Sequence, residues 1–275
     1  MKTTKLLFFG TLFSLLAIGC NKDEDTVPAA PVNSEEVAAN AQMDNISDDV
    51  LQITESQSNQ EPAGRSSAGV QNFLTECATI TTVQSENTWT RTIDFGTTNC
   101  ALYNGNMVRG KIIITFTNDF VATTRTISYA FEDFYHNDRH VEGNKTIVKT
   151  RLSNNHPQAT IALDLTATTT AGAVYQRTGQ RVREFTEGYD TPLILWDNVF
   201  SITGNWATTL PNGNISTATI SSPVTVKWNC IHIVSGIVTF TRNLNIAVLD
   251  YGDGECDNQA TVTINGVVHP ITLGN

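Results

Sequence analysis

From residue 70 onward, hydrophobic and polar side chains alternate with a period of two. Such strict alternation is typical of antiparallel strands that bury one face. The pattern predicts a mostly β fold, an antiparallel meander of about a dozen strands that forms a curved sheet, a sandwich or an open barrel. The residues expected to face the interior are Ile112, Ile114, Phe116, Ile127, Tyr129, Phe131, Ile161, Leu163, Leu165, Leu244, Ile246, Val248, Val262 and Ile264.

Three Asn-Gly pairs mark turns between these strands: Asn104-Gly105, Asn212-Gly213 and Asn265-Gly266. Both central residues of a type I′ hairpin turn need a positive φ, which Asn and Gly adopt readily. The third pair predicts the clearest hairpin, in which residues 260–264 lead into the turn and residues 267–273 return from it.

A helical segment is expected before the strands, over residues 35–56. Ser34 followed by two glutamates is typical of a helix N-terminus. The apolar positions fall loosely on one face, but the polar stretch 45–48 interrupts them, so we expect one or two short N-terminal helices. A helix that covers part of the sheet is favoured over a helix that binds a partner. Residues 57–69 contain several Ser and Gly residues and one Pro, and they predict a linker to a β domain at 70–275.

The N-terminus has the features of an export signal. Two lysines precede an uncharged run at 6–18, which is too short to span a bilayer and fits a signal peptide over residues 1–19. Leu16-Ala17-Ile18-Gly19-Cys20 resembles the lipobox of bacterial lipoproteins, although Ala17 stands where that motif usually has Leu. The resemblance implies cleavage before Cys20 and acylation of that residue (palmitate and related chains), which would anchor the protein in the outer membrane. An ordinary secretory cut or an uncleaved anchor is the alternative.

Residues 20–34 would form a flexible tether after the anchor. Lys22, Asp23 and Glu24 resemble the export signal of surface lipoproteins in Bacteroidota. This resemblance implies an outer-membrane lipoprotein that faces the extracellular side. The alternative is a solvated charged tether on a protein that faces the periplasm.

The net charge limits the classes of binding partner, and the cysteine count indicates disulfide bonds. Without Lys2 and Lys5, 17 basic residues become 15 against 27 acidic ones, a net charge of −12, which disfavours nucleic acid. Four cysteines remain after Cys20, and an even number in an exported chain predicts disulfides. Of three possible connectivities, proximity in sequence favours Cys77–Cys100 and Cys230–Cys256. The sequence contains no CxxC pair, so nothing in the cysteine spacing indicates a zinc site.

Two segments repeat one pattern: aliphatic, Asp, aromatic, Gly, three residues, Cys, at 93–100 and 249–256. The repeat suggests an internal duplication over about residues 73–168 and 190–275. The shared Asp and Gly are residues that a turn requires. The second copy carries further acids and is a calcium candidate, but it lacks the spacing of an EF-hand loop, so a structural turn is favoured. The candidate ligands are Asp250, Asp253, Glu255 and Asp257.

Other candidate chemistry is sparse. His136 and His140 flank a predicted turn and could bind a metal, and Glu132-Asp133 or Glu184 with Glu187 could form a carboxylate pair. No nucleophile elbow or phosphate loop is present, so we expect neither an enzyme nor a cofactor. Aromatic residues could stack on sugars, although core packing is favoured for them. They are Trp89, Trp196, Trp206, Trp228, Tyr135, Tyr175 and Tyr189.

The lipobox, the two Asp-aromatic-Gly units and the stretch 131–135 before a hairpin that ends at 141–143 together resemble a group of uncharacterised β-rich Bacteroidota lipoproteins. The resemblance covers most of the mature chain and implies no particular activity. We therefore expect a lipid-anchored β protein with a non-enzymatic binding or structural role. The alternatives are a surface glycan-binding module and a periplasm-facing carrier of lipid or of lipoproteins.

Overall fold

The computed structural model describes residues 34–58, 74, 76–117, 119, 122–191, 194, 196–242 and 245–273. These residues form one helix, α1 (Ser34–Ser58), and one antiparallel sheet of fifteen strands, which confirms the mostly β meander with an N-terminal helix. The predicted signal peptide, Cys20, the export residues Lys22, Asp23 and Glu24, and most of the linker lie outside the described residues. The strands are β1 (Thr79–Gln84), β2 (Thr88–Asp94), β3 (Cys100–Ala101), β4 (Met107–Thr117), β5 (Thr124–His136), β6 (Arg139–Glu142), β7 (Asn144–Arg151), β8 (Pro157–Thr168), β9 (Val174–Glu187), β10 (Val199–Thr209), β11 (Ile215–Lys227), β12 (Ser235–Arg242), β13 (Asn245–Asp253), β14 (Gln259–Ile264) and β15 (Val267–Thr272).

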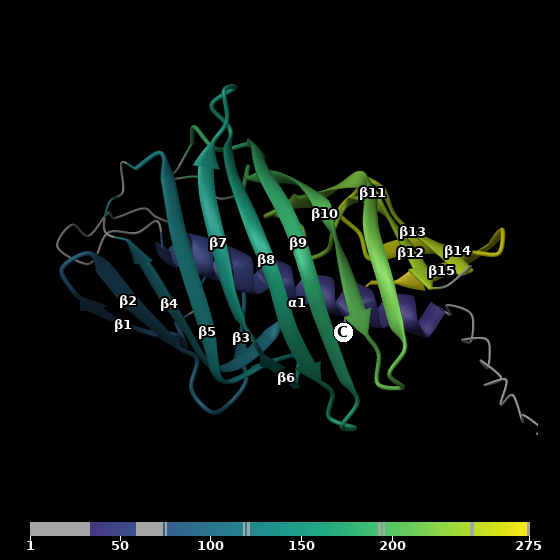
Figure 1. Ribbon diagram of the computed structural model, residues 1–275, viewed down its shortest axis with the longest axis horizontal. Coiled ribbons are helices and arrows are strands. Elements are labelled where there is room, and N and C mark those ends of the chain that lie inside the picture. The colour runs from purple at the N-terminus through teal and green to yellow at the C-terminus, as the bar shows by residue number, and fades with distance from the viewer. Residues whose placement is uncertain are drawn as a thin grey trace, which may run out of the picture.

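Each strand pairs mainly with its neighbour in sequence, so the sheet is a meander from β1 at one edge to β15 at the other. β3 pairs only with β4, and β7 is inserted between β5 and β8. Figure 1 shows that the strands cross α1 steeply and that the sheet curls around the helix. The helix lies against β4 and β5 of the first half and against β15 at the far edge. The fold is therefore a curved sheet with a helix inside the curve.

The helix is enclosed rather than laid over one face. No residue from Glu36 to Ser58 is exposed, and ten of those buried carry polar side chains. The helix runs unbroken through residues 45–48, where the sequence suggested an interruption, because Asp48 and Asp49 find partners on the sheet. Among the described residues no helix combines the length and hydropathy that a membrane span needs.

The alternation predicted the buried face correctly in most strands. Ile112, Ile114 and Phe116 of β4 are buried, and β8 behaves in the same way. In β13 the prediction was wrong: Ala247, Leu249 and Tyr251 face the interior, whereas Ile246 is 53% exposed. Inward-facing polar groups decide this register, because Tyr251 reaches an acid of α1. Leu244 lies outside the described residues.

A bulge bends the sheet where β4 meets β5. The pairing register shifts between Arg109 and Lys111, at Gly110. Gly110 has a φ of +84°, and Asp133 opposite it has a φ of +46°. The extra residue explains why Phe131 and Phe134, three positions apart, pack their rings together at 5.1 Å. Bulges of this kind increase strand twist and help a sheet to curl.

The Asn-Gly pairs do form hairpins, but only one has the predicted turn type. Asn265 and Gly266 both have positive φ, at +52° and +79°, as a type I′ turn requires. At Gly105 and Gly213 only the glycine is left-handed, and the closing hydrogen bonds enclose three-residue loops. A type I turn followed by a left-handed glycine is the next most common hairpin connection, which the same two letters also permit.

Candidate functional site

The inner face of the sheet is cationic, which the sequence analysis did not predict. Six basic side chains point inward and are each at most 5% exposed. Three of them lie on β9, at positions 177, 181 and 183, and so share one face of the strand. Buried cations need partners, because an unpaired buried charge is costly. The six residues are Arg91, Lys145, Arg177, Arg181, Arg183 and Arg242.

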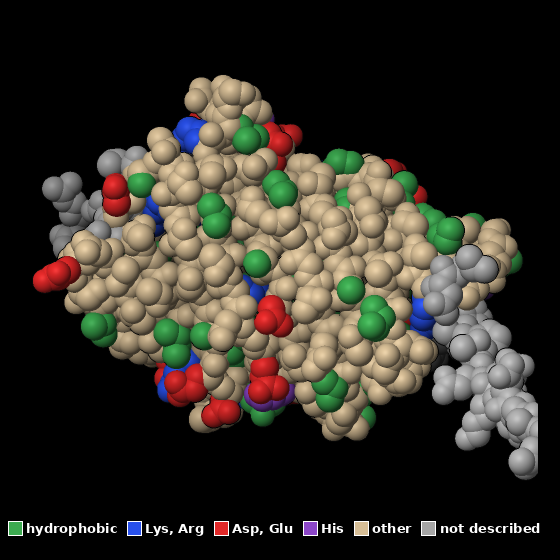
Figure 2. All heavy atoms as spheres, viewed as in Figure 1, with side chains coloured by type: hydrophobic (Ala, Val, Ile, Leu, Met, Phe, Trp, Pro, Cys, Tyr) green, Lys and Arg blue, Asp and Glu red, His purple; other side chains and the backbone are tan. Residues whose placement is uncertain are grey.

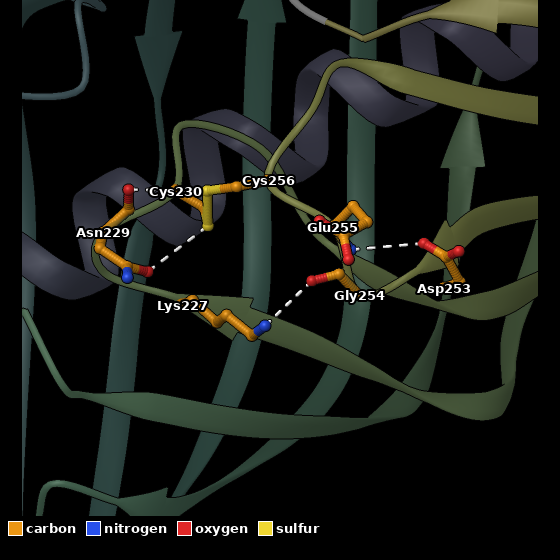
Figure 3. The surroundings of a disulfide bond; sticks show 7 residues. All are labelled: Lys227, Asn229, Cys230, Asp253, Gly254, Glu255 and Cys256. Carbon is orange, nitrogen blue, oxygen red and sulfur yellow. Dashed lines mark hydrogen bonds between the residues drawn. A yellow bond between two sulfur atoms is a disulfide. The ribbon is translucent and has the colours of Figure 1, made fainter.

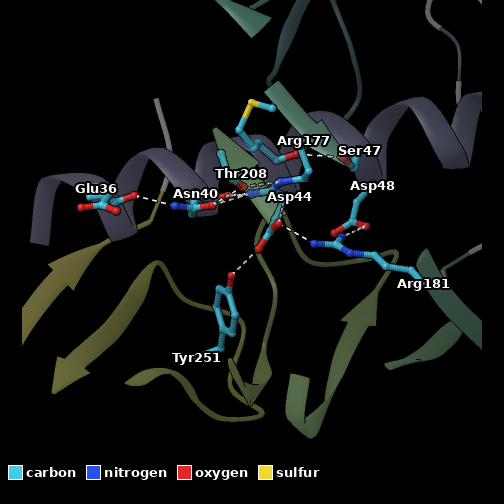
Figure 4. Close-up of polar contacts among 10 residues, drawn as sticks. Glu36, Asn40, Asp44, Ser47, Asp48, Arg177, Arg181, Thr208 and Tyr251 are labelled. Atoms are coloured by element: carbon cyan, nitrogen blue, oxygen red, sulfur yellow. Dashed lines mark hydrogen bonds and ion pairs between the residues drawn. The ribbon is translucent and has the colours of Figure 1, made fainter. Parts of the chain in front are cut away.

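Helix α1 supplies most of the partners, with Asp44 at the centre (Figure 4). Oδ1 of Asp44 accepts hydrogen bonds from both Arg177 and Arg181, and Oδ2 accepts one from the Tyr251 hydroxyl at 3.0 Å. Burial by itself raises the pKa of Asp44, but the charges of the two arginines and the hydrogen bonds outweigh it and hold the pKa below its ordinary value. Asp44 therefore joins α1 to both β9 and β13.

Further contacts continue along both sides of the helix. Glu55 forms ion pairs with Arg183 at 2.7 Å and with Lys149 at 3.4 Å. Glu36 forms one with Arg242 at 3.0 Å. Asn40 accepts hydrogen bonds from Arg177 at 2.9 Å and from the Thr208 hydroxyl at 3.0 Å. These contacts extend from the first turn of the helix to the last, so the sheet holds the whole helix.

Asp49 anchors the helix to the hairpin at Asn104-Gly105 and to the end of β5. Its carboxylate accepts hydrogen bonds from Asn104 at 2.6 Å and Asn106 at 2.7 Å, and it lies 2.8 Å from Nε2 of His136. His136, one of the two histidines considered for a metal, is thus a buried partner of α1. His140 instead packs on Tyr135, with ring centroids 4.9 Å apart.

Two arginines meet the C-terminal end of the helix. Arg91 donates to the carbonyl of Gln57, and Arg125 donates to the carbonyl of Ser58 at 2.9 Å. The last carbonyls of a helix have no partner within it and carry partial negative charge. The two arginines supply hydrogen-bond donors to these carbonyls and positive charge beside their partial negative charge.

Two buried ionisable groups, Asp48 and Lys145, are less well paired than the other charged residues around the helix. Burial raises the pKa of Asp48 to about 6, although Arg181, 3.5 Å from Oδ1, acts in the other direction. Burial lowers the pKa of Lys145 to about 7, and the charges of Arg181 and Arg177 lower it further. Within the described residues, neither Oδ2 of Asp48 nor Nζ of Lys145 has a hydrogen-bond partner. Both groups are therefore incompletely compensated.

A small pocket of about 80 Å³ opens beside the middle of α1. Its floor is polar, with Asp48 and Asp49 among the helix residues that line it. Its rim comes from three separate loops that carry Tyr103, Trp196 and the stretch 228–233. The Tyr103 and Trp196 rings meet edge to face, with centroids 6.3 Å apart, and both side chains are exposed. The pocket thus combines buried carboxylates with accessible aromatic rings.

One rim of the pocket is fixed by a disulfide (Figure 3). The structure pairs Cys230 with Cys256 and Cys77 with Cys100, with Cα atoms 5.4 and 5.9 Å apart, which confirms the predicted connectivity. Cys230 lines the pocket, and Lys227 donates to the carbonyl of Gly254 at 2.9 Å beside it. The second repeat unit therefore braces the loop that carries Trp228 and His232.

The repeated Asp-aromatic-Gly segments adopt the same local structure. Asp94 accepts a hydrogen bond from the Gly96 amide at 2.8 Å, and Asp250 accepts one from the Gly252 amide at 3.0 Å. Both glycines have positive φ and both aromatic rings are buried. The units then diverge, because β2 pairs with the strand after its Asn-Gly turn whereas β13 pairs with the strand before it.

The acids considered for calcium cap turns in the same way. Asp253 and Asp257 accept hydrogen bonds from the amides of Glu255 and Gln259, at 3.4 and 2.9 Å. In the part of the chain that the structure describes, no group of three or more His, Cys, Asp or Glu side chains is arranged to hold a metal ion. Asp250, Asp253 and Asp257 thus take the structural role that the sequence analysis favoured.

The remaining sequence candidates are dispersed. Glu132 pairs with Lys111 at 2.6 Å, and Glu184 lies 2.6 Å from Nδ1 of His156. Trp89 and Trp206 are core residues, and the guanidinium of Arg181 lies 4.3 Å from the Trp206 ring. The candidate aromatic residues therefore form no single row; Trp196 is the exposed one among them. Partly buried are Trp228, Tyr135, Tyr175 and Tyr189.

The contacts between the helix and β9 have a signal in the sequence, although the sequence pattern was not expected to produce them. Asp44 and Asp48 are four residues apart and share a helix face, whereas Arg177, Arg181 and Arg183 recur at even spacing in a strand. Charged residues at inward positions of a strand, matched by acids on a helix, predict an enclosed ionic contact. The pocket has no comparable signal, because its walls come from four distant parts of the chain.

The face seen in Figure 2 has no comparable concentration of charge; its hydrophobic side chains are spread over it and its charged ones lie mostly toward the edges. The buried charged side chains described above are gathered around α1. A scan against protein-family models matches no family, and searches of curated proteins and of solved structures return no match. The geometry of the site is consequently the basis for a functional proposal.

Proposed function

We propose that the protein is a lipid-anchored outer-membrane protein that binds an extracellular glycan, without chemistry, at the pocket beside α1. One observation carries the proposal: exposed aromatic rings and buried polar groups meet at one small opening. Sugars are recognised by this combination, since their apolar faces stack on aromatic rings and their hydroxyls bond to carboxylates and amides. The broader role, non-enzymatic binding, follows from the sequence expectation.

The pocket is rigidly built, which suits a binding site. Its floor belongs to the enclosed helix, and one wall is held by the Cys230–Cys256 disulfide. Asn104, at another wall, is hydrogen-bonded to Asp49. A site that is ordered before its ligand arrives loses less conformational entropy on binding.

The carrier alternative is less well supported. A carrier of acyl chains would need an apolar cavity or an apolar concave face. Here α1 fills the curve of the sheet, and buried cations line it. These observations favour a polar ligand at the pocket over a lipid inside the sheet.

A glycan array tests the binding proposal. The full mature chain in detergent should bind a restricted set of glycans, and Trp196→Ala should abolish that binding because it removes the exposed ring of the pocket. Ile215→Ala is the matched control, since Ile215 is also an exposed hydrophobic residue but does not line the pocket. Absence of any glycan signal with the unaltered chain would refute the proposal.

The location is tested separately in cells. Palmitate labelling should require Cys20, so Cys20→Ala should lose it. Protease shaving of intact cells should release peptides from residue 79 onward. A chain in which Lys22, Asp23 and Glu24 are all replaced by Ala should stay protected until the outer membrane is opened. Equal protection of both chains would overturn the surface assignment.

A further inference from the structure

We infer that the pocket beside α1 accepts a primary ammonium group, so that an amino sugar with a free amine is its preferred ligand. The inference rests on the proposed function and specifies the ligand class of the same site. It is based on the charges that line the pocket, on the partners that those charges lack, on the aromatic walls and on the size of the opening.

The charges at the pocket have one sign. Asp48 and Asp49 line it, and no lysine or arginine does. His232, the remaining titratable side chain of the wall apart from Tyr103 and the disulfide-bonded Cys230, has its pKa lowered by burial, so it is neutral at pH 7. An arriving cation therefore meets carboxylates and no opposing charge from the walls themselves.

The two carboxylates differ in how well they are satisfied. Asp49 uses both oxygens on Asn104, Asn106 and His136. Asp48 has a single ion pair, at 3.5 Å from Arg181, and that arginine also donates to Asp44. Oδ2 of Asp48 and Nδ1 of His232 have no hydrogen-bond partner among the described residues, although both side chains are at least partly buried. Buried polar atoms in this state are what a bound donor group would satisfy.

The aromatic walls add a second attraction. Tyr103, Trp196 and Trp228 all line the pocket. Aromatic faces attract cations, and Trp does so most strongly. Trp228 is held in place by its contact with Phe200, at 6.0 Å between centroids. A carboxylate at the floor and aromatic rings at the rim would surround an ammonium group from several sides.

The size of the pocket limits what enters it. A single water needs about 10–15 Å³ of such space. A pocket of about 80 Å³ accepts a group of several non-hydrogen atoms, such as an amine and its carbon, but not an oligosaccharide. The rest of the sugar would lie at the mouth, where Trp196 is 45% exposed.

The test compares three monosaccharides that differ at one position: glucosamine, N-acetylglucosamine and glucose. Binding to the full mature chain is followed by tryptophan fluorescence at pH 7, since Trp196 and Trp228 line the pocket. Glucosamine should bind about tenfold more tightly than the two neutral sugars, because a charge-assisted hydrogen bond is stronger than a neutral one. Asp48→Asn should remove that difference.

Two control variants keep the result interpretable. Glu132→Gln removes a carboxylate that is paired with Lys111 away from the pocket and should leave the preference unchanged. Trp196→Leu should weaken the binding of all three sugars. The chain should keep its fold, because Trp196 is exposed. If Asp48→Asn proves too unstable, the same information comes from adding methylammonium to the unaltered chain, which should displace bound glucosamine. Failure of methylammonium to displace it would overturn the inference.

The outcomes separate this inference from the proposed function. Equal affinity for all three sugars, lost in Trp196→Leu, would overturn the ammonium preference and leave glycan binding intact. Failure of all three sugars to bind would overturn the inference, and failure of the glycan array as well would overturn the proposed function.

Discussion

At the scale of single residues, the molecule depends on buried charges that are shared between partners. Asp44 serves two arginines and a tyrosine, so its carboxylate compensates more than one buried group. Ion pairs of this kind contribute little net stability compared with apolar packing, but breaking one leaves charges uncompensated. Single substitutions at these positions should therefore have large effects.

Replacing Asp44 with Ala tests this expectation. The change leaves Arg177 and Arg181 buried without their main acceptor, so we expect the free energy of unfolding to fall by about 3–5 kcal/mol. Urea denaturation followed by circular dichroism measures it. Glu132→Ala is the control, because its pair with Lys111 lies at the surface, and it should shift the midpoint little. Similar shifts in the two variants would show that the buried contacts contribute no more than surface ones.

Lys145 should make stability depend on pH in the alkaline range. Its pKa is about 7 in the folded chain, because burial and the charges of Arg181 and Arg177 disfavour the proton, and about 10.4 when unfolded. Between these values the unfolded chain holds the proton and the folded chain does not. The free energy of unfolding should therefore rise with pH across this window.

The measurement compares the unaltered chain with Lys145→Met, which has a similar volume and no charge. From pH 7.5 to 9.5 the unaltered chain should gain on the order of 2 kcal/mol relative to the variant. Position 145 is the one difference between the two chains, so the difference between their pH profiles reports on the lysine. Parallel pH profiles for the two chains would contradict the buried, deprotonated lysine.

At the scale of elements, the bulge between β4 and β5 controls how the sheet bends. A Cβ atom at Gly110 would lie 1.9 Å from the carbonyl oxygen of Asp133, in addition to the strain of a φ of +84°. Gly213 has nearly the same φ, +82°, but open space around it. Comparing alanine substitutions at the two glycines therefore distinguishes the cost of backbone strain from the cost of a steric clash.

Gly213→Ala should cost about 1–2 kcal/mol, the usual penalty of a left-handed residue with a side chain. Gly110→Ala should cost clearly more, or prevent recovery of folded protein, because the opposing strand must move away. Urea midpoints and the yield of soluble protein provide the readout. Equal effects would indicate that the bulge adjusts without loss and does not set the curvature.

At the scale of the whole molecule, the helix cannot leave the sheet without separating Asp44 and Glu55 from the buried arginines with which they pair. The helix and sheet should therefore unfold as one cooperative unit. Regions that open only with global unfolding show the slowest hydrogen exchange.

Hydrogen exchange followed by mass spectrometry tests this cooperativity. Amides of α1 should exchange as slowly as those of β8 and β9, whereas β1 and β15 should exchange faster because every residue of β1, and all but one of β15, is exposed. The edge strands are the internal control. Faster exchange in α1 than in β8 and β9 would indicate that the helix leaves the sheet independently.

The sequence by itself determined the fold class and the main strands, and it favoured the disulfide pairing that the structure has. Alternation over 111–116 and 161–165 reflects local burial on one face of a strand, which needs no knowledge of distant residues. The cysteines pair with their near neighbours, and Asp94 and Asp250 act within their own turns. All of these features depend on short stretches of chain.

Only the tertiary structure decided what lies inside the curve and where the pocket forms. Inward arginines such as Arg177 are placed in the core because an acid on a helix more than 130 residues away compensates them, as Asp44 does. The same long-range contacts turn Tyr251 inward and Ile246 outward in β13. The pocket joins α1, Tyr103, Trp196 and the disulfide loop, which approach one another because the sheet curls around the helix.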